Sequence, residues 1–150
     1  MQERLSLIKL LPQWILDAGC GAGRDLLPLQ QRYPQSQLLG IDAALPMLRA
    51  ASAATGVTRS ALQNLFARLI GSDRLASPGA LLGCADFAQL PLSARRIDLL
   101  WSNLALHWHP QPHTVLAEWA RVLRTDGLLM FSCLGPDTFA ELREIFRSEE

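Results

Sequence analysis

The chain has 150 residues, with fourteen basic and fourteen acidic side chains that give a formal net charge of zero. This balance provides no global attraction to nucleic acid or to an anionic membrane, so neither is expected as a partner. Apolar residues make up 49% of the chain and charged residues 19%, which is typical of a globular protein and excludes a disordered one. The length predicts one domain, residues 1–150, with a hydrophobic core.

Cysteine usage and hydropathy indicate the compartment. No apolar run has the length of a membrane span, and the first eleven residues lack a signal-peptide pattern. Cys20, Cys84 and Cys133 are odd in number, widely spaced and embedded in apolar runs. They fit neither a disulfide framework nor a zinc site, so we expect reduced thiols in a cytoplasmic protein.

The first predicted elements surround a glycine-rich stretch. Residues 3–11 carry apolar side chains at helical spacing, and residues 14–18 form a short apolar run typical of a buried strand. The strand leads into Asp17-Ala18-Gly19-Cys20-Gly21-Ala22-Gly23, and a helix is predicted over residues 26–33. Glycines are required where the backbone turns sharply and approaches a ligand closely.

The spacing within this loop distinguishes between ligands. A dinucleotide fingerprint has glycine or alanine where this chain has Arg24, and the Gly-Lys-Ser/Thr end of a phosphate-binding loop is missing. Asp17 stands directly before the loop, where a fixed carboxylate repels a pyrophosphate and attracts a cationic group. The loop with Gly19, Gly21 and Gly23 therefore predicts a site for a positively charged nucleoside, a description that S-adenosylmethionine fits.

A second acid lies at the end of the next predicted strand, residues 37–42. Asp42 follows Gly23 by 19 residues. In doubly wound folds an acid about 20 residues beyond the glycine loop accepts hydrogen bonds from ribose hydroxyls, and we expect this role for Asp42. The alternative, which can hold at the same time, is that Asp42 caps a helix over residues 45–54.

The rest of the chain continues the alternation of strands and helices. An amphipathic helix is predicted over residues 60–69, in an alanine-rich and mildly basic stretch, and Pro112 opens another. A last helix after Asp137 should direct Phe139 and Phe146 toward the core. Further strands are predicted over residues 81–87, 97–101 and 128–132. The alternation predicts an α/β fold, a Rossmann-like doubly wound parallel sheet of five strands with helices on both faces.

The segment after the fourth predicted strand is polar and aromatic. Ligands of open α/β sheets bind at the carboxyl ends of the strands, so we expect Asn103 to meet the methionine part of S-adenosylmethionine and His107 and Trp108 to border the pocket beside it. Trp108 is equally compatible with an ordinary core position. The three histidines of this region lack a nearby carboxylate or cysteine to complete a ligand set, so no metal site is predicted.

The stretch from Asp17 to Gly23 resembles the first motif of class I S-adenosylmethionine-dependent methyltransferases. The resemblance implies that Asp86 accepts a hydrogen bond from the exocyclic amine of adenine and that Phe87 lies against the ring. From the residues alone, a turn-initiating Asp86 is equally favoured. The family's sheet has two strands after the fifth, and relatives carry a helical segment before the first strand that helps cover the cofactor. We therefore expect a partial domain that holds only the first five strands.

Four stretches resemble one branch of this family, the biotin-pathway malonyl-acyl-carrier-protein methyltransferases. They are residues 3–10, 90–92, 101–108 and 134–143. His107 departs from the glutamine expected in many members of that branch. The mitochondrial complex I assembly methyltransferase-like proteins share the histidine–tryptophan pair at residues 107 and 108 and a similar segment after the fifth strand, so they are the alternative branch.

The branch resemblance implies transfer of the sulfonium methyl group to the free carboxylate of malonyl-acyl-carrier protein or malonyl-CoA. A carboxylate is already a nucleophile at neutral pH, so no catalytic base is assigned. The family's substrate-facing region lies largely beyond residue 150, and we expect this chain to bind the cofactor without activity alone. The alternatives are a methyltransferase for another carboxylic acid or a quinone precursor, and a non-catalytic assembly or scaffold protein.

Overall fold

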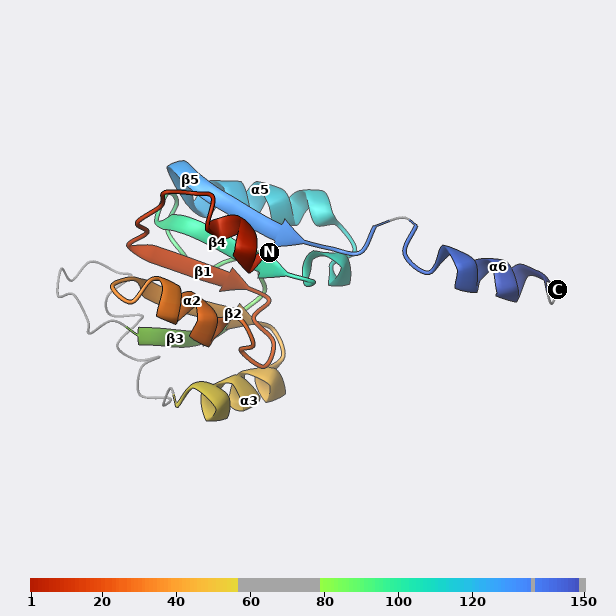
Figure 1. Ribbon diagram of the computed structural model, residues 1–150, viewed down its shortest axis with the longest axis horizontal. Coiled ribbons are helices and arrows are strands. Elements are labelled where there is room, and N and C mark those ends of the chain that lie inside the picture. The colour runs from red at the N-terminus through yellow and green to blue at the C-terminus, as the bar shows by residue number, and fades with distance from the viewer. Residues whose placement is uncertain (57–78, 136, 149–150) are drawn as a thin grey trace.

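The computed structural model describes residues 1–56, 79–135 and 137–148, and its centre is a parallel β-sheet (Figure 1). The described residues form five strands in the order β3-β2-β1-β4-β5, and every neighbouring pair is parallel. The strands are β1 (Trp14–Ala18), β2 (Gln37–Asp42), β3 (Gly79–Cys84), β4 (Ile97–Asn103) and β5 (Leu123–Ser132). The order reverses at β1, because β2 and β3 extend to one side of it and β4 and β5 to the other. The expected doubly wound sheet is thus confirmed.

Helices cover both faces of the sheet. The described helices are α1 (Gln2–Leu5), α2 (Leu26–Arg32), α3 (Leu45–Thr55), the 3-10 turn η1 (Leu106–Trp108), α5 (Pro112–Val122) and α6 (Ala140–Ser148), and all of them except α6 contribute to this cover (Figure 1). Side chains of α1, α2 and α3 pack on one face, and those of α5 and η1 pack on the other. None of the described helices has the length and apolar character needed to cross a lipid bilayer.

Successive strand residues contribute to opposite cores, as the alternation of side chains along a strand requires. Ile15 and Leu99 belong to the core beneath α2, whereas Leu16 and Leu100 belong to the core beneath α5. All four are fully buried. A parallel sheet that is covered on both faces needs apolar residues at consecutive positions, which explains the uninterrupted apolar runs of the central strands.

The N-terminal helix is shorter than the pattern of apolar residues predicts. α1 ends at Leu5, which is fully buried, while Leu7 and Leu11 are exposed. The hydroxyl of Ser6 donates to the carbonyl of Glu3 at 2.6 Å, a local bond that competes with continuation of the helix. The predicted helix over residues 3–11 is therefore wrong beyond its first turn.

The prediction for the C-terminal helix is wrong in its packing. α6 extends away from the sheet in Figure 1, and Phe139 and Phe146 are 65% and 64% exposed instead of facing the core. Its spacing predicts an apolar face correctly, but spacing does not identify what that face contacts. The helix predicted over residues 60–69 lies outside the described residues.

Candidate functional site

The candidate site lies where the carboxyl ends of the central strands meet, at the point where the strand order reverses. The loop after β1 is fastened to the end of β2, because the N–H groups of Gly19 and Cys20 both donate to the carbonyl of Ile41, at 2.8 and 3.0 Å. The N–H of Gly21 donates to Asp42 Oδ2 at 2.8 Å. The predicted glycine loop and the predicted acid of β2 are therefore in direct contact.

The three glycines of the loop have different surroundings. Gly19 has φ +77°, and a Cβ built there would lie 2.4 Å from Cβ of Ala105, just before η1. A Cβ on Gly23 would lie 3.0 Å from Cβ of Ala51 in α3. Only at Gly21 among the three, with φ +53°, would a Cβ meet no atom within 4 Å. Packing inside the protein thus requires two of the glycines, and the third leaves backbone open to a ligand.

Asp17 is a buried acid in β1, and its surroundings disfavour its charge. The side chain is 2% exposed. Burial, and then the neighbouring carboxylates of Asp25 and Asp42, raise its pKa well above the usual range for aspartate. A bound cation would offset both effects, so the position suits a positively charged ligand group.

Asp42 binds main-chain N–H groups through both of its oxygens, one of them in the glycine loop. Oδ2 accepts from Gly21, and Oδ1 accepts from the N–H of Ala44 at 2.8 Å. The N-cap of α3 is Ala44, and its first turn receives no side-chain cap bond. The alternative in which Asp42 caps this helix is therefore wrong. Each carboxylate oxygen keeps a second acceptor site, so these two bonds leave capacity for a ligand hydroxyl.

Asp25 is a site residue that the sequence reasoning missed. Its Oδ2 accepts from Trp101 Nε1 at 3.1 Å and from Asn103 Nδ2 at 3.0 Å. Asn103 Oδ1 in turn accepts from the hydroxyl of Ser132 at 2.7 Å, so the amide is held between an acceptor and a donor. The only sequence signal is an acid at the start of α2. It would be taken for a helix cap, although the structure shows no cap bond there.

Phe87 and Asp86 follow β3 and differ in their contacts. The ring of Phe87 lies 3.6 Å from the position that a Cβ on Gly19 would occupy, so it lies beside the glycine loop. Asp86 is exposed, and its Oδ1 accepts from the N–H of Ala88 at 2.7 Å. Asp86 does initiate a turn, as the alternative from the residues alone predicts, and its second oxygen is available for a further role.

His107 and Trp108 are both exposed, and Trp108 is 79% exposed. The alternative in which Trp108 is an ordinary core residue is wrong. The histidine that reaches the loop region is His109, whose ring centroid lies 6.1 Å from that of Phe87. His109 is two residues after His107, and the segment lacks the regular periodicity of a helix or a strand. The sequence therefore could not predict which of the two histidines lies near Phe87. No group of three or more metal-ligating side chains occurs among the described residues.

Together these contacts define an acidic edge with one aromatic wall. Asp17, Asp25 and Asp42 supply the negative charge, Gly21 supplies open backbone, and Phe87 supplies a flat apolar surface. The arrangement can accept a ligand that combines a cationic group with a planar ring.

Comparison with known proteins identifies the family of the chain. Residues 16–131 match the family model described as a methyltransferase domain. The chain is 47% identical over 149 residues to a malonyl-acyl-carrier-protein O-methyltransferase of a Methylovorus species, covering 99% of this chain and 46% of that protein. A protein of the same name from Laribacter hongkongensis is 47% identical over 146 residues, covering 97% and 46%. The chain thus spans about half the length of these curated relatives.

Solved structures agree in fold. An S-adenosylmethionine-dependent methyltransferase from Mesorhizobium loti superposes with a TM-score of 0.63 at 26% identity, covering 88% of this chain and 52% of that one. The plantazolicin methyltransferase, solved in complex with SAH, gives a TM-score of 0.67 at 19% identity, covering 93% and 46%. The matching family model, the curated relatives and the five-stranded sheet all lead to one assignment: the chain belongs to the methyltransferase-domain family and has the class I methyltransferase fold.

Proposed function

We propose that this chain binds S-adenosylmethionine at the carboxyl edge of its sheet, as the cofactor-binding part of an enzyme that methylates the free carboxylate of malonyl-acyl-carrier protein in biotin synthesis. The observation that carries the proposal is the buried carboxylate of Asp17, which lies near the carboxylates of Asp25 and Asp42. The acceptor rests on the names of relatives up to 47% identical to this chain.

The residues at this edge fit the chemical groups of S-adenosylmethionine. Asp17 would attract the ammonium and sulfonium charges. Asp42 would accept from the ribose hydroxyls through its remaining acceptor sites. Phe87 would lie against the adenine, and Asp86 would accept from the exocyclic amine. Asn103 would meet the methionine part, in the orientation that Asp25 and Ser132 give it. Gly19, Gly21 and Gly23 shape the loop that would surround these groups.

The chemistry requires little of the chain beyond alignment. When bound, S-adenosylmethionine supplies an electrophilic methyl group. Since the acceptor carboxylate is already a nucleophile, the protein needs to hold the reacting groups in line and to remove water from the anion. His107 and Trp108 are exposed in η1 and would border the acceptor side of the pocket. No catalytic base is proposed.

The partner and compartment form part of this proposal. Malonyl-CoA is the alternative carrier, because it presents the same carboxylate on a thioester. The zero net charge supports neither nucleic acid nor a membrane as a partner. The cysteines in the described residues are all free thiols, which is consistent with the cytoplasm.

A chimera tests the function. The segment of the Methylovorus enzyme that this chain matches is replaced by this chain, and the chimera is supplied with methyl-labelled S-adenosylmethionine and either malonyl-acyl-carrier protein or malonyl-CoA. We expect a base-labile methyl ester on the carrier protein, while this chain alone binds the cofactor and forms none. A chimera that binds the cofactor but methylates neither acceptor contradicts the proposed substrate. A folded chain without cofactor affinity favours a scaffold role.

A further inference from the structure

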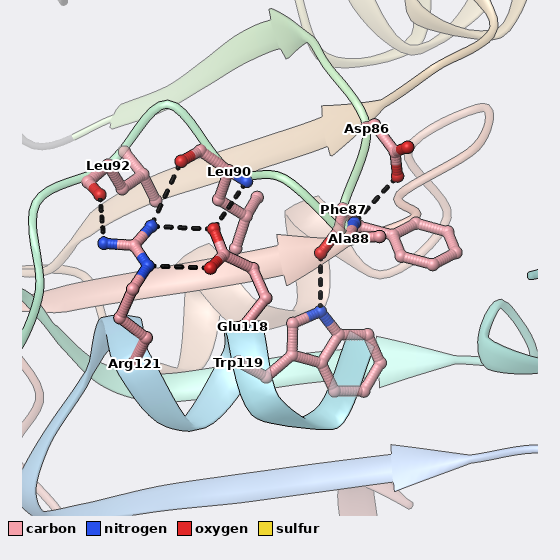
Figure 2. A network of polar contacts seen from close by, with 8 residues as sticks. All are labelled: Asp86, Phe87, Ala88, Leu90, Leu92, Glu118, Trp119 and Arg121. Carbon is pink, nitrogen blue, oxygen red and sulfur yellow. Dashed lines mark hydrogen bonds and ion pairs between the residues drawn. The ribbon is translucent and has the colours of Figure 1, made fainter. Parts of the chain in front are cut away.

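Three side chains of α5 hold the segment that follows β3, and the main-chain contacts are shown in Figure 2. Glu118 Oε1 accepts from the N–H of Leu90 at 2.7 Å. Arg121 donates to the carbonyls of Leu92 and Leu90, at 2.8 and 3.2 Å. The indole N–H of Trp119 donates to the carbonyl of Phe87 at 3.1 Å. α5 therefore satisfies four main-chain groups of a segment that is neither helix nor strand.

The acid and the base of this group also bind each other. Arg121 Nε donates to Glu118 Oε2 and Arg121 Nη2 to Glu118 Oε1, both at 2.7 Å. Two parallel bonds between a guanidinium and a carboxylate fix their relative orientation as well as their distance. The pair thus forms a clamp in which Glu118 binds Leu90 and Arg121 binds both Leu90 and Leu92.

The clamped segment begins at the candidate ligand site. Phe87 lies beside Gly19, and its ring also packs against Trp119, with centroids 6.0 Å apart. Asp86 is the adjacent residue, and its turn to Ala88 leads directly into the clamped stretch. A shift of Leu90 or Leu92 would therefore move Phe87, which lies beside the glycine loop, and the adjacent Asp86.

We propose that Glu118, Trp119 and Arg121 are positioning residues that set selectivity for the adenine base by fixing Asp86 and Phe87. The inference rests on the proposed cofactor site. The clamp supports the residues that would meet the adenine, which is one end of the cofactor. Loss of the clamp should therefore weaken recognition of the exocyclic amine more than it weakens binding of the ring. A merely structural role would lower the stability of the fold without changing which base is preferred.

The test compares S-adenosylhomocysteine with S-inosylhomocysteine by calorimetric titration. In the second ligand a carbonyl replaces the exocyclic amine and the adjacent ring nitrogen N1 carries a proton, so the hydrogen-bonding pattern at this edge of the base is reversed. We expect wild type to bind the adenine ligand about tenfold more tightly, and Arg121→Met to reduce this ratio to near one. Arg124→Met is the matched control. Arg124 forms the other described ion pair, with Asp98 at 2.9 Å, and is 35% exposed against 40% for Arg121. It should keep the wild-type ratio.

The outcomes separate this inference from the proposed function. An unchanged ratio in Arg121→Met overturns the positioning role and leaves the cofactor site intact. Wild type that binds neither ligand overturns the cofactor site and the inference with it. If Arg121→Met does not fold, Glu118→Gln replaces it, because the amide oxygen still accepts from Leu90 while the charge pair is lost. Glu118→Gln should lower the ratio of the two affinities by a smaller factor than Arg121→Met. An unchanged ratio in Glu118→Gln overturns the inference.

Discussion

At the scale of single residues, Asp17 combines deep burial with two neighbouring carboxylates. Its raised pKa means that the folded chain holds a proton that the unfolded chain releases at lower pH. The free energy of unfolding should therefore fall as pH rises from about 3.9, the ordinary aspartate pKa, through the raised value in the fold. Binding of a cation would reverse this loss.

Asp17→Asn should separate stability from ligand binding. The amide has no charge to desolvate, so the variant should be more stable than wild type by about 1–3 kcal/mol near pH 8 and by less near pH 4. Its affinity for S-adenosylmethionine should fall by about tenfold. Urea denaturation at both pH values and calorimetric titration measure the two effects. A variant less stable than wild type near pH 8 would contradict the account of Asp17.

Asp25 differs from Asp17 because its Oδ2 accepts from two side chains of β4. Asp25→Ala would leave the indole N–H of the fully buried Trp101 and the amide of Asn103 without this acceptor. We expect a loss of about 2–4 kcal/mol in the free energy of unfolding. Asp25→Asn, which keeps an acceptor oxygen, should lose less. Equal stability of the alanine variant and wild type in urea denaturation would show that the network contributes nothing.

At the scale of elements, the loop after β1 contains one glycine that packing requires, Gly19, and one that leaves the backbone open to a ligand, Gly21. Gly19→Ala should destabilise the fold by about 2 kcal/mol or more, because its Cβ would collide with Ala105 at a positive φ. Ala105→Gly in the same chain should recover the part due to collision, which a double-mutant cycle measures. Additive effects of the two substitutions would contradict the contact.

Gly21→Ala provides the comparison within the same loop. Its Cβ meets no neighbour, so only the backbone cost of about 1 kcal/mol should appear in denaturation. Affinity for S-adenosylmethionine should nevertheless fall, because the added methyl occupies the open face of the loop. Cofactor affinity equal to that of wild type would show that the ligand does not approach Gly21.

Local patterns predicted part of this site and could not predict the rest. The glycine loop and Asp42 were accessible from the sequence because strand, loop and acid follow one another at fixed spacing. Asp25 and the α5 clamp were not, because their partners lie far along the chain: 76 residues separate Asp25 from Trp101, and 32 separate Phe87 from Trp119. Such contacts depend on strand order, which alternating elements do not specify.

At the scale of the whole molecule, the parallel sheet and its two cores followed from uninterrupted apolar strands alternating with helices. The packing of α6 could not be predicted in this way, because an apolar helical face does not specify what it contacts.

Phe146→Ser should change the free energy of unfolding by less than about 0.5 kcal/mol, since the side chain is exposed. Leu99→Ala, at a fully buried position, should cost about 2–5 kcal/mol. A large loss for Phe146→Ser in urea denaturation would mean that α6 packs on the sheet.

The central claim is that a cationic nucleoside binds where β1, β2 and β4 end, and calorimetric titration of S-adenosylmethionine into this chain tests it most directly. Wild type should bind, and Asp42→Asn should lose about 1.5–3 kcal/mol, since a carboxylate that accepts ligand hydroxyls and braces Gly21 is replaced by an amide. Asp126→Asn, the same change at an exposed acid with φ +65°, is the control and should bind like wild type. Absence of binding by the folded chain, or equal affinity in Asp42→Asn, would contradict the claim.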